Sequence, residues 1–380
     1  MRWRGAVVCA VLLARPWTCS GQSRADANPW FVRSGITTDH IVSRNPFAPA
    51  TGQEGGPIDD GHDFTFEIGR QTDGSQEWHP LYGMPSYGFG FSLSSFRNDV
   101  VHSRPFDAYT FFSWPFAQLA DHLDLTTDFG MGLSWHWKEV NERTASSQPT
   151  LASDLNAYID WGFYLRWAST PRTVVYAGFD YTHRSNGGMV QPDQGINVLG
   201  PKVAMQYNFS PDTRNVRPVK PPTFHPSWEF IVGGAGGVKS AGDSAPIAQQ
   251  NFGVVDATTG AQWHFYRFGK IASGIDLSYD GSAGARLDGT TAMTRADAGQ
   301  RWALGVYGGY EHVIGKFGAL LQPGFVVARG SERANSSRFY QRLGWRYHVN
   351  DHFWGSVSLR AVEGRIADAL EFGAGYRLRQ

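Results

Sequence analysis

The chain has few cysteines and few charged residues, and each shortage excludes a class of protein. Its two cysteines, Cys9 and Cys19, stand in a leading segment that we expect to be removed, so the mature protein has no thiol for a disulfide, a nucleophile or a metal site. Charged residues make up 18% of the sequence, and the formal net charge is +0. Because no basic run is present, we do not expect nucleic-acid binding. After the leading segment, no stretch is long and apolar enough for a membrane-spanning helix.

The leading segment has the features of a secretory signal peptide. Arg2 and Arg4 precede a short apolar run at residues 5–14, and Ala25-Asp26-Ala27 is a candidate cleavage site, with a cut after Gly21 as the alternative. We therefore assign residues 1–27 to the signal peptide and expect an exported protein. Aromatic residues reach 14%, and there are 45 glycines. An exported chain of this composition without spanning helices is typical of a β-barrel in the bacterial outer membrane.

Long alternating segments are the main structural signal. Between Leu123 and Trp137, apolar residues occupy the odd positions and mostly polar or small residues the even positions, and residues 155–167 and 175–185 repeat the pattern. Side chains on a strand alternate between its two faces. Strands of soluble proteins are usually about 5–6 residues long, whereas a strand that crosses a membrane needs about 9–11. The length of these segments therefore favours a transmembrane barrel.

We predict an all-β fold, an antiparallel transmembrane β-barrel with about 14–16 strands in one barrel; the alternative is an eight-stranded barrel followed by a second β-unit. Residues 28–209 form the first group of strand candidates, and residues 228–380 form a second group that completes or extends the barrel. The proline-rich residues 210–227 between them are expected to be a linker or a long turn. Pairing of the segments near 30–38 and 368–378 would support the single barrel.

The connections between strand candidates suggest which end of the barrel faces outward. Outer-membrane barrels have short periplasmic turns and longer external loops. Residues 117–122 and 168–172 are short connections, whereas residues 138–153 are long and polar. This alternation places the loop after Ser185 on the external side. The connection at residues 71–85 is long although it falls on the periplasmic side, and the sequence offers no reason for it.

Two residues with chemical potential occupy the apolar face of the strand at 175–185. His183 and Ser185 share this face with Phe179 and Tyr181. Serine is a weak nucleophile until a base accepts its proton, and histidine is suited to that role near neutral pH. Residues i and i+2 lie about 6.6 Å apart along a strand, so the two side chains can converge. We predict Ser185 as nucleophile and His183 as general base; on its own, such a pair is more often an ordinary surface feature.

The residues around this pair resemble a known family. His183-Arg184-Ser185-Asn186-Gly187-Gly188, followed by Gln191-Pro192-Asp193-Gln194-Gly195-Ile196-Asn197, is similar to the signature of the lipid A 3-O-deacylase (PagL) family and its larger relatives, the acyloxyacyl hydrolases. The resemblance covers roughly residues 30–209. It implies an outer-membrane barrel that removes an ester-linked acyl chain from lipid A, with its site on the lipid-facing wall. The upstream matches are Phe66-Glu67-Ile68-Gly69, Gln71-Thr72-Asp73-Gly74, Trp78, Leu81-Tyr82, Pro85 and Leu155-Asn156-Ala157-Tyr158.

The resemblance also implies roles for the neighbouring residues, with two departures. Asn186 and Gly187 match the family's oxyanion-binding region. An oxyanion that forms during the reaction needs hydrogen-bond donors that are already in place. Asn197 stands where the family's deacylase prototype has a glutamate, so the third member of the triad is an amide here. Asp193 stands where the family has an oxyanion-associated asparagine, and it is an alternative source of the missing acid. These two departures favour reduced catalytic efficiency.

The leading function is therefore an outer-membrane serine esterase, a carboxylic ester hydrolase of the lipid A 3-O-deacylase type, that needs no cofactor and no metal. Its expected partners are lipid A or lipopolysaccharide and outer-membrane lipids, with a homodimer left open. Two alternatives remain: a catalytically weakened lipid-binding or structural barrel, and a porin-like channel. The sequence does not define which ester bond is cut.

Overall fold

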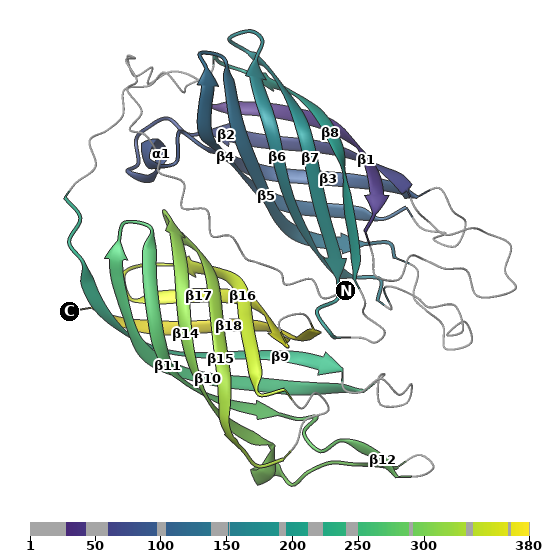
Figure 1. Cartoon of the computed structure of the whole chain (residues 1–380), viewed down its shortest axis with the longest axis vertical. Coiled ribbons are helices and arrows are strands. Elements are labelled where there is room, and N and C mark those ends of the chain that lie inside the picture. Colours follow the sequence, from purple (N-terminus) through teal and green to yellow (C-terminus); the bar gives the residue numbers. More distant parts are fainter. Residues whose placement is uncertain are drawn as a thin grey trace, which may run out of the picture.

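The computed structural model describes residues 28–42, 60–96, 104–137, 151, 153–189, 195–211, 223–240, 250–288, 292–331, 337–363 and 366–379. All long elements in these ranges are antiparallel β-strands, and they form two closed barrels of eight strands each (Figure 1). The expected all-β antiparallel barrel architecture is thereby confirmed. No helix in the described ranges is long and apolar enough to cross a membrane.

The first barrel contains strands β1 to β8 in chain order, and β8 pairs with β1 to close it. Each strand is 11 to 15 residues long, which is the length that the alternating segments predict. The strands are β1 (Trp30–Ile41), β2 (Asp60–Gln71), β3 (Ser86–Phe96), β4 (Phe106–Ala120), β5 (Leu123–Trp135), β6 (Asn156–Ala168), β7 (Thr173–Ser185) and β8 (Ile196–Asn208).

The second barrel begins after the proline-rich segment, and its last strand pairs with its first. A short hairpin of β12 (Arg286–Asp288) and β13 (Ala292–Thr294) interrupts it, followed by the 3₁₀ helix η3 (Ala298–Arg301). The barrel strands are β9 (Ser227–Ser240), β10 (Asn251–Tyr266), β11 (Gly269–Asp280), β14 (Trp302–Ile314), β15 (Phe317–Arg329), β16 (Phe339–His348), β17 (Phe353–Val362) and β18 (Ile366–Arg379).

The expectation of about 14–16 strands in one barrel is therefore corrected in favour of its alternative, a first eight-stranded barrel followed by a second β-unit. The reason is hydrogen-bond closure. β1 is paired on one side with β2 and on the other with β8, so it has no free edge for β18, which pairs with β9 instead. The segments near 30–38 and 368–378 do not pair.

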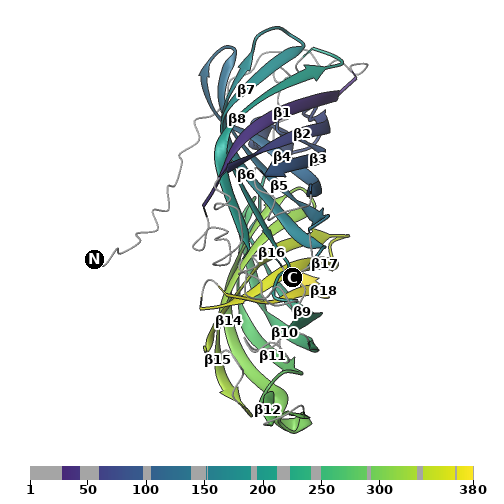
Figure 2. The ribbon, with the colours of Figure 1, turned by 90° about the vertical axis from the view of Figure 1, so that its right-hand side faces the viewer.

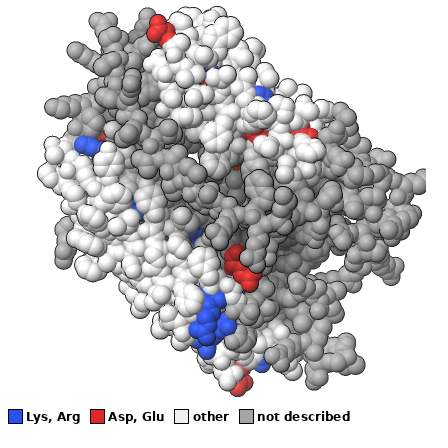
Figure 3. Space-filling model, in the orientation of Figure 1, with Lys and Arg blue, Asp and Glu red and all other residues white. Residues whose placement is uncertain are grey.

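The interior of both barrels is filled mainly by charged and polar side chains together with a few buried aromatic and aliphatic clusters, while most apolar side chains point outward. An eight-stranded barrel has an interior just wide enough for side chains to fill. This filling argues against the channel alternative. On the face shown in Figure 3, Lys, Arg, Asp and Glu are confined to a few places of the described surface. Interior ion pairs include Arg184–Asp107 at 2.6 Å, Lys202–Asp180 at 2.8 Å, Arg342–Asp276 at 2.6 Å and Arg346–Glu311 at 2.7 Å.

The long connection between β2 and β3 has a structural explanation. It carries the short helix α1 (Trp78–Leu81), and Tyr82 at the end of this helix contacts Phe268 and β14 of the second barrel. The Tyr82 hydroxyl donates to the Val313 carbonyl at 3.0 Å and lies 2.9 Å from Nε2 of His312. Burial raises the pKa of Tyr82, in keeping with a neutral phenol that donates. The length that the turn pattern leaves unexplained therefore serves contact between the two barrels.

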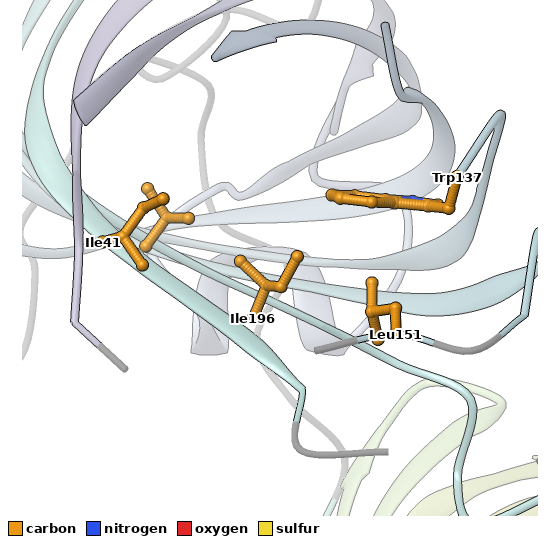
Figure 4. Packing of buried hydrophobic residues seen from close by; sticks show 5 residues of the cluster. Ile41, Trp137, Leu151 and Ile196 are labelled. Atoms are coloured by element: carbon orange, nitrogen blue, oxygen red, sulfur yellow. The ribbon is translucent and has the colours of Figure 1, made fainter. Parts of the chain in front are cut away.

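The end of the first barrel where β7 stops is closed by a buried apolar cluster. Ile41, Trp137, Leu151 and Ile196 gather there with Val198 (Figure 4). Because Ile196 and Val198 point inward, Asn197 between them points outward. The cluster thereby holds the beginning of β8 in place beside the end of β7.

Candidate active site

Adjacent strands place the candidate residues on one outward-facing patch. His183 of β7 is the register partner of Asn197 of β8, and paired residues of antiparallel strands present their side chains on the same face. Phe179, which lies on the same face of β7 four residues before His183, is 62% exposed. Arg184 lies between the two candidate residues of β7 and is fully buried inside the barrel. The predicted outward orientation of His183 thus follows from the observed alternation.

The imidazole of His183 lies between Ser185 and Asn197. Nε2 of His183 is 3.0 Å from Oγ of Ser185, and Nδ1 is 2.7 Å from Oδ1 of Asn197. An amide oxygen can only accept a hydrogen bond, so the ring proton is on Nδ1 of His183. This N–H donates a hydrogen bond to Oδ1 of Asn197. In that neutral tautomer Nε2 has a lone pair and accepts from the Ser185 hydroxyl. The arrangement is thus suited to withdraw a proton from the serine.

Tyr181 adds a second donor to the amide oxygen. Its hydroxyl donates to Oδ1 of Asn197 at 2.7 Å, so this oxygen accepts from both the phenol and the imidazole. An amide oxygen has two lone pairs and can satisfy both donors. Tyr181 thereby holds the Asn197 side chain in the orientation that serves His183. No role was predicted for Tyr181 from the sequence, although its position two residues before His183 on the same face is a signal that it could contact the site.

The chain reverses immediately after Ser185 in a turn that needs glycine. Gly187 and Gly188 have φ values of 67° and 81°, and the Met189 N–H lies 3.4 Å from the Asn186 carbonyl oxygen. Two central residues with positive φ are characteristic of type I′ turns, in which glycine avoids a steric penalty. The turn places Asn186 and the Gly187 backbone directly beside Ser185 in the chain.

Gly195 gives the imidazole room on its other side. Its φ is 69°, and a Cβ built there would lie 2.8 Å from Cε1 of His183. Any side chain at this position would therefore displace the imidazole. The requirement for glycine at the entrance to β8 is thus part of the geometry of the site.

The structure brings together three of the predicted residues, His183, Ser185 and Asn197, through hydrogen bonds. Asn186 and Gly187 are buried and follow Ser185 in the chain. The alternative acid, Asp193, lies outside the described residues. Within the part of the chain that the structure describes, no group of three or more metal-ligating side chains is placed to hold a metal ion.

Two closed barrels with apolar outer walls define a β-barrel membrane protein, and the outward His–Ser pair gives it a candidate hydrolytic site. Residues 64–206 match the family model "Lipid A 3-O-deacylase (PagL)", and residues 226–380 match "Acyloxyacyl hydrolase, C-terminal domain". The chain belongs to this lipid A deacylase and acyloxyacyl hydrolase family. Family and fold together indicate an outer-membrane hydrolase that acts on esters.

The chain is also similar to solved structures of an outer membrane enzyme and of a porin. The outer membrane enzyme PagL is 16% identical, with coverage of 47% of this chain and 98% of that chain and a TM-score of 0.30. A mutant porin of Rhodopseudomonas blastica is 10% identical, with coverage of 92% of this chain and 99% of that chain and a TM-score of 0.16. No match was found among curated proteins.

Proposed function

We propose that this protein is a serine esterase that removes an ester-linked acyl chain from lipid A or a related outer-membrane lipid. The observation that carries the proposal is the hydrogen-bonded chain from Ser185 through His183 to Asn197 on the outer wall of the first barrel. A hydroxyl activated by an oriented imidazole is the arrangement that nucleophilic ester hydrolysis requires. The family assignment supplies lipid A as the expected substrate class.

The reaction proceeds in two halves. His183 Nε2 accepts the proton of Ser185 as Oγ attacks the ester carbonyl carbon, and the carbonyl oxygen becomes an oxyanion. The protonated Nε2 then gives this proton to the alkoxide oxygen of the lipid as its bond to the carbonyl carbon breaks, so the lipid departs with a free hydroxyl and the acyl group stays on Ser185. Water, activated by the same nitrogen, attacks this acyl-enzyme; the fatty acid departs and Oγ regains its proton. Asn197 holds the imidazole throughout.

The oxyanion requires donors that are already in place when charge develops. The amide group of Asn186 and the backbone N–H of Gly187 are the proposed donors, because both follow the nucleophile directly. The positive φ values of Gly187 and Gly188 turn the backbone sharply at this point. A backbone without side chains allows an ester to approach closely.

The surroundings of the site suit a substrate that arrives from the lipid layer. Trp161 of β6 is 51% exposed and is the register partner of Tyr181, and Leu199 of β8 is 43% exposed. These outward apolar side chains form a surface for acyl chains beside the imidazole. Lipid A in the surrounding leaflet would therefore reach the site laterally, without entering the barrel.

We further propose residues 28–209 as the unit that carries the reaction, residues 228–380 as a second unit, and residues 210–227 as the linker between them. Asn197 is the proposed third member of the triad. It orients the ring but stabilises imidazolium less than a carboxylate would, so modest activity is expected. Asp193 remains the alternative acid.

The test is hydrolysis of lipid A by the full-length mature protein purified in detergent. We expect a product that has lost the mass of one acyl chain, and no product with Ser185→Ala. Ser337→Ala is the matched control, since its hydroxyl bonds locally in the second barrel: it donates to the Phe339 carbonyl and accepts from the Phe339 N–H, both at 3.2 Å. An unchanged lipid mass with the parent protein, or equal product with Ser185→Ala, would reject the proposal.

A further inference from the structure

The second barrel contacts the turn that follows Ser185. Leu359 of β17 and Leu370 of β18 are register partners on the outer wall of this barrel. A Cβ built on Gly187 would lie 3.4 Å from Cδ1 of Leu359 and 3.4 Å from Cβ of Leu370, which is ordinary van der Waals contact. The proposed oxyanion turn of the first barrel thus packs directly against an aliphatic pair of the second.

The neighbouring glycine makes polar contacts with the same barrel. The Ser240 N–H at the end of β9 donates to the Gly188 carbonyl at 2.8 Å. A Cβ built on Gly188 would lie only 2.9 Å from the Ala367 carbonyl oxygen. Only a glycine therefore lets the two backbones approach this closely. The turn is held against the second barrel by a hydrogen bond as well as by packing.

Contacts elsewhere fix the relative position of the two barrels, which lie next to each other in both ribbon views (Figures 1 and 2). Phe129 of β5 and Trp345 of β16 pack with ring centroids 5.1 Å apart. Near α1, Glu77 forms an ion pair with Arg267. Because the barrels touch at several separate places, the surface of the second barrel beside Gly187 has a fixed position relative to the first barrel.

We infer that the second barrel forms one wall of the substrate site, in which Leu359 and Leu370 contact the acyl chain of the ester bound at Ser185 and set which chain is accepted. The inference rests on the proposed function. A carbonyl carbon in reach of Ser185 has its oxygen near the Gly187 turn, and the alkyl chain that begins at this carbon must lie against a neighbouring surface. The aliphatic pair offers such a surface, without polar groups that would need partners.

The size of the effect follows from the apolar area that the chain buries. Each methylene that packs against the leucines contributes about a fourfold factor in kcat/KM, if its burial is retained in the transition state. Contact with two or more methylenes beyond the fourth carbon, which a butyrate lacks, would therefore separate long from short acyl esters by at least an order of magnitude.

The experiment measures chain-length preference with a series of nitrophenyl esters from butyrate to palmitate. For Leu370→Ala we expect kcat/KM to fall about fourfold or more for palmitate while butyrate turnover is unchanged; Leu359→Ala should behave alike. Leu277→Ala is the matched control, because Leu277 is 43% exposed on β11, a strand that is not a neighbour of β17 or β18 in the barrel. A chain-length profile for Leu370→Ala identical to that of Leu277→Ala would overturn the inference.

A second measurement does not depend on turnover. A palmitate ester with a photoreactive group in its alkyl chain is bound to the Ser185→Ala variant and cross-linked. Attachment to the β17 and β18 peptides would support the inference that the second barrel contacts the acyl chain. Attachment confined to β6, β7 and β8 would overturn that inference. Failure of the proposed function would instead appear as absent turnover of every ester by the parent protein. The two failures are therefore distinguishable.

Discussion

Replacement of Asn197 by aspartate tests the proposed triad most directly, because it changes charge while keeping shape. Oδ1 of Asn197 accepts from Nδ1 of His183 at 2.7 Å, and aspartate can place an oxygen at the same point. When Ser185 loses its proton the imidazole becomes cationic, and a carboxylate then forms a charge-assisted hydrogen bond in place of a neutral one. Such bonds are about twice as strong as neutral bonds, which contribute about 1 kcal/mol each.

The transition state should therefore gain about 1 kcal/mol, which corresponds to about a fivefold rise in kcat/KM. The hydroxyl of Tyr181, 2.7 Å from the same oxygen, keeps the new carboxylate in position. The assay is release of fatty acid from lipid A near neutral pH, well above the ordinary aspartate pKa of about 3.9.

Asn197→Leu is the opposing control. It removes the shared acceptor, leaves two donors without a partner and frees the ring to rotate, so we expect a loss on the order of a hundredfold. If Asn197→Asp folds as well as the parent but is slower or unchanged, the residue does not orient His183 during the reaction. Asp193 would then become the stronger candidate for the third member.

Two further substitutions test the framework of the site. Gly195→Ala should lower kcat by about ten- to a hundredfold, because the new Cβ would lie 2.8 Å from His183 Cε1. Gly253→Ala is the control and should have no effect, because no atom lies within 4 Å of a Cβ built there. Equal rates for the two variants would refute the claim that the position of the imidazole depends on Gly195. Arg184→Leu should lower the free energy of unfolding by about 3–5 kcal/mol, because it leaves the buried Asp107 carboxylate unpaired; an unchanged thermal midpoint in detergent would contradict this.

The sequence alone determined the strand pattern and the face that carries the chemistry. Alternation with a period of two is a local property, so it can be read from residues 175–185 without knowledge of any partner strand. It places His183 and Ser185 on the outer face of the strand; in the structure the two side chains are hydrogen-bonded to each other, with Ser185 7% exposed. The motif around them likewise indicated the family.

Only the tertiary structure decided how many barrels form and what surrounds the site. Closure depends on hydrogen bonds between strands far apart in the chain, such as β1 with β8 and β9 with β18, and both halves show the same alternation. The contact of Tyr181 with Asn197 depends on the register between β7 and β8. The approach of Leu359 and Leu370 to Gly187 depends on how two separate barrels pack, and no local pattern encodes that contact because each barrel closes its own hydrogen bonds independently.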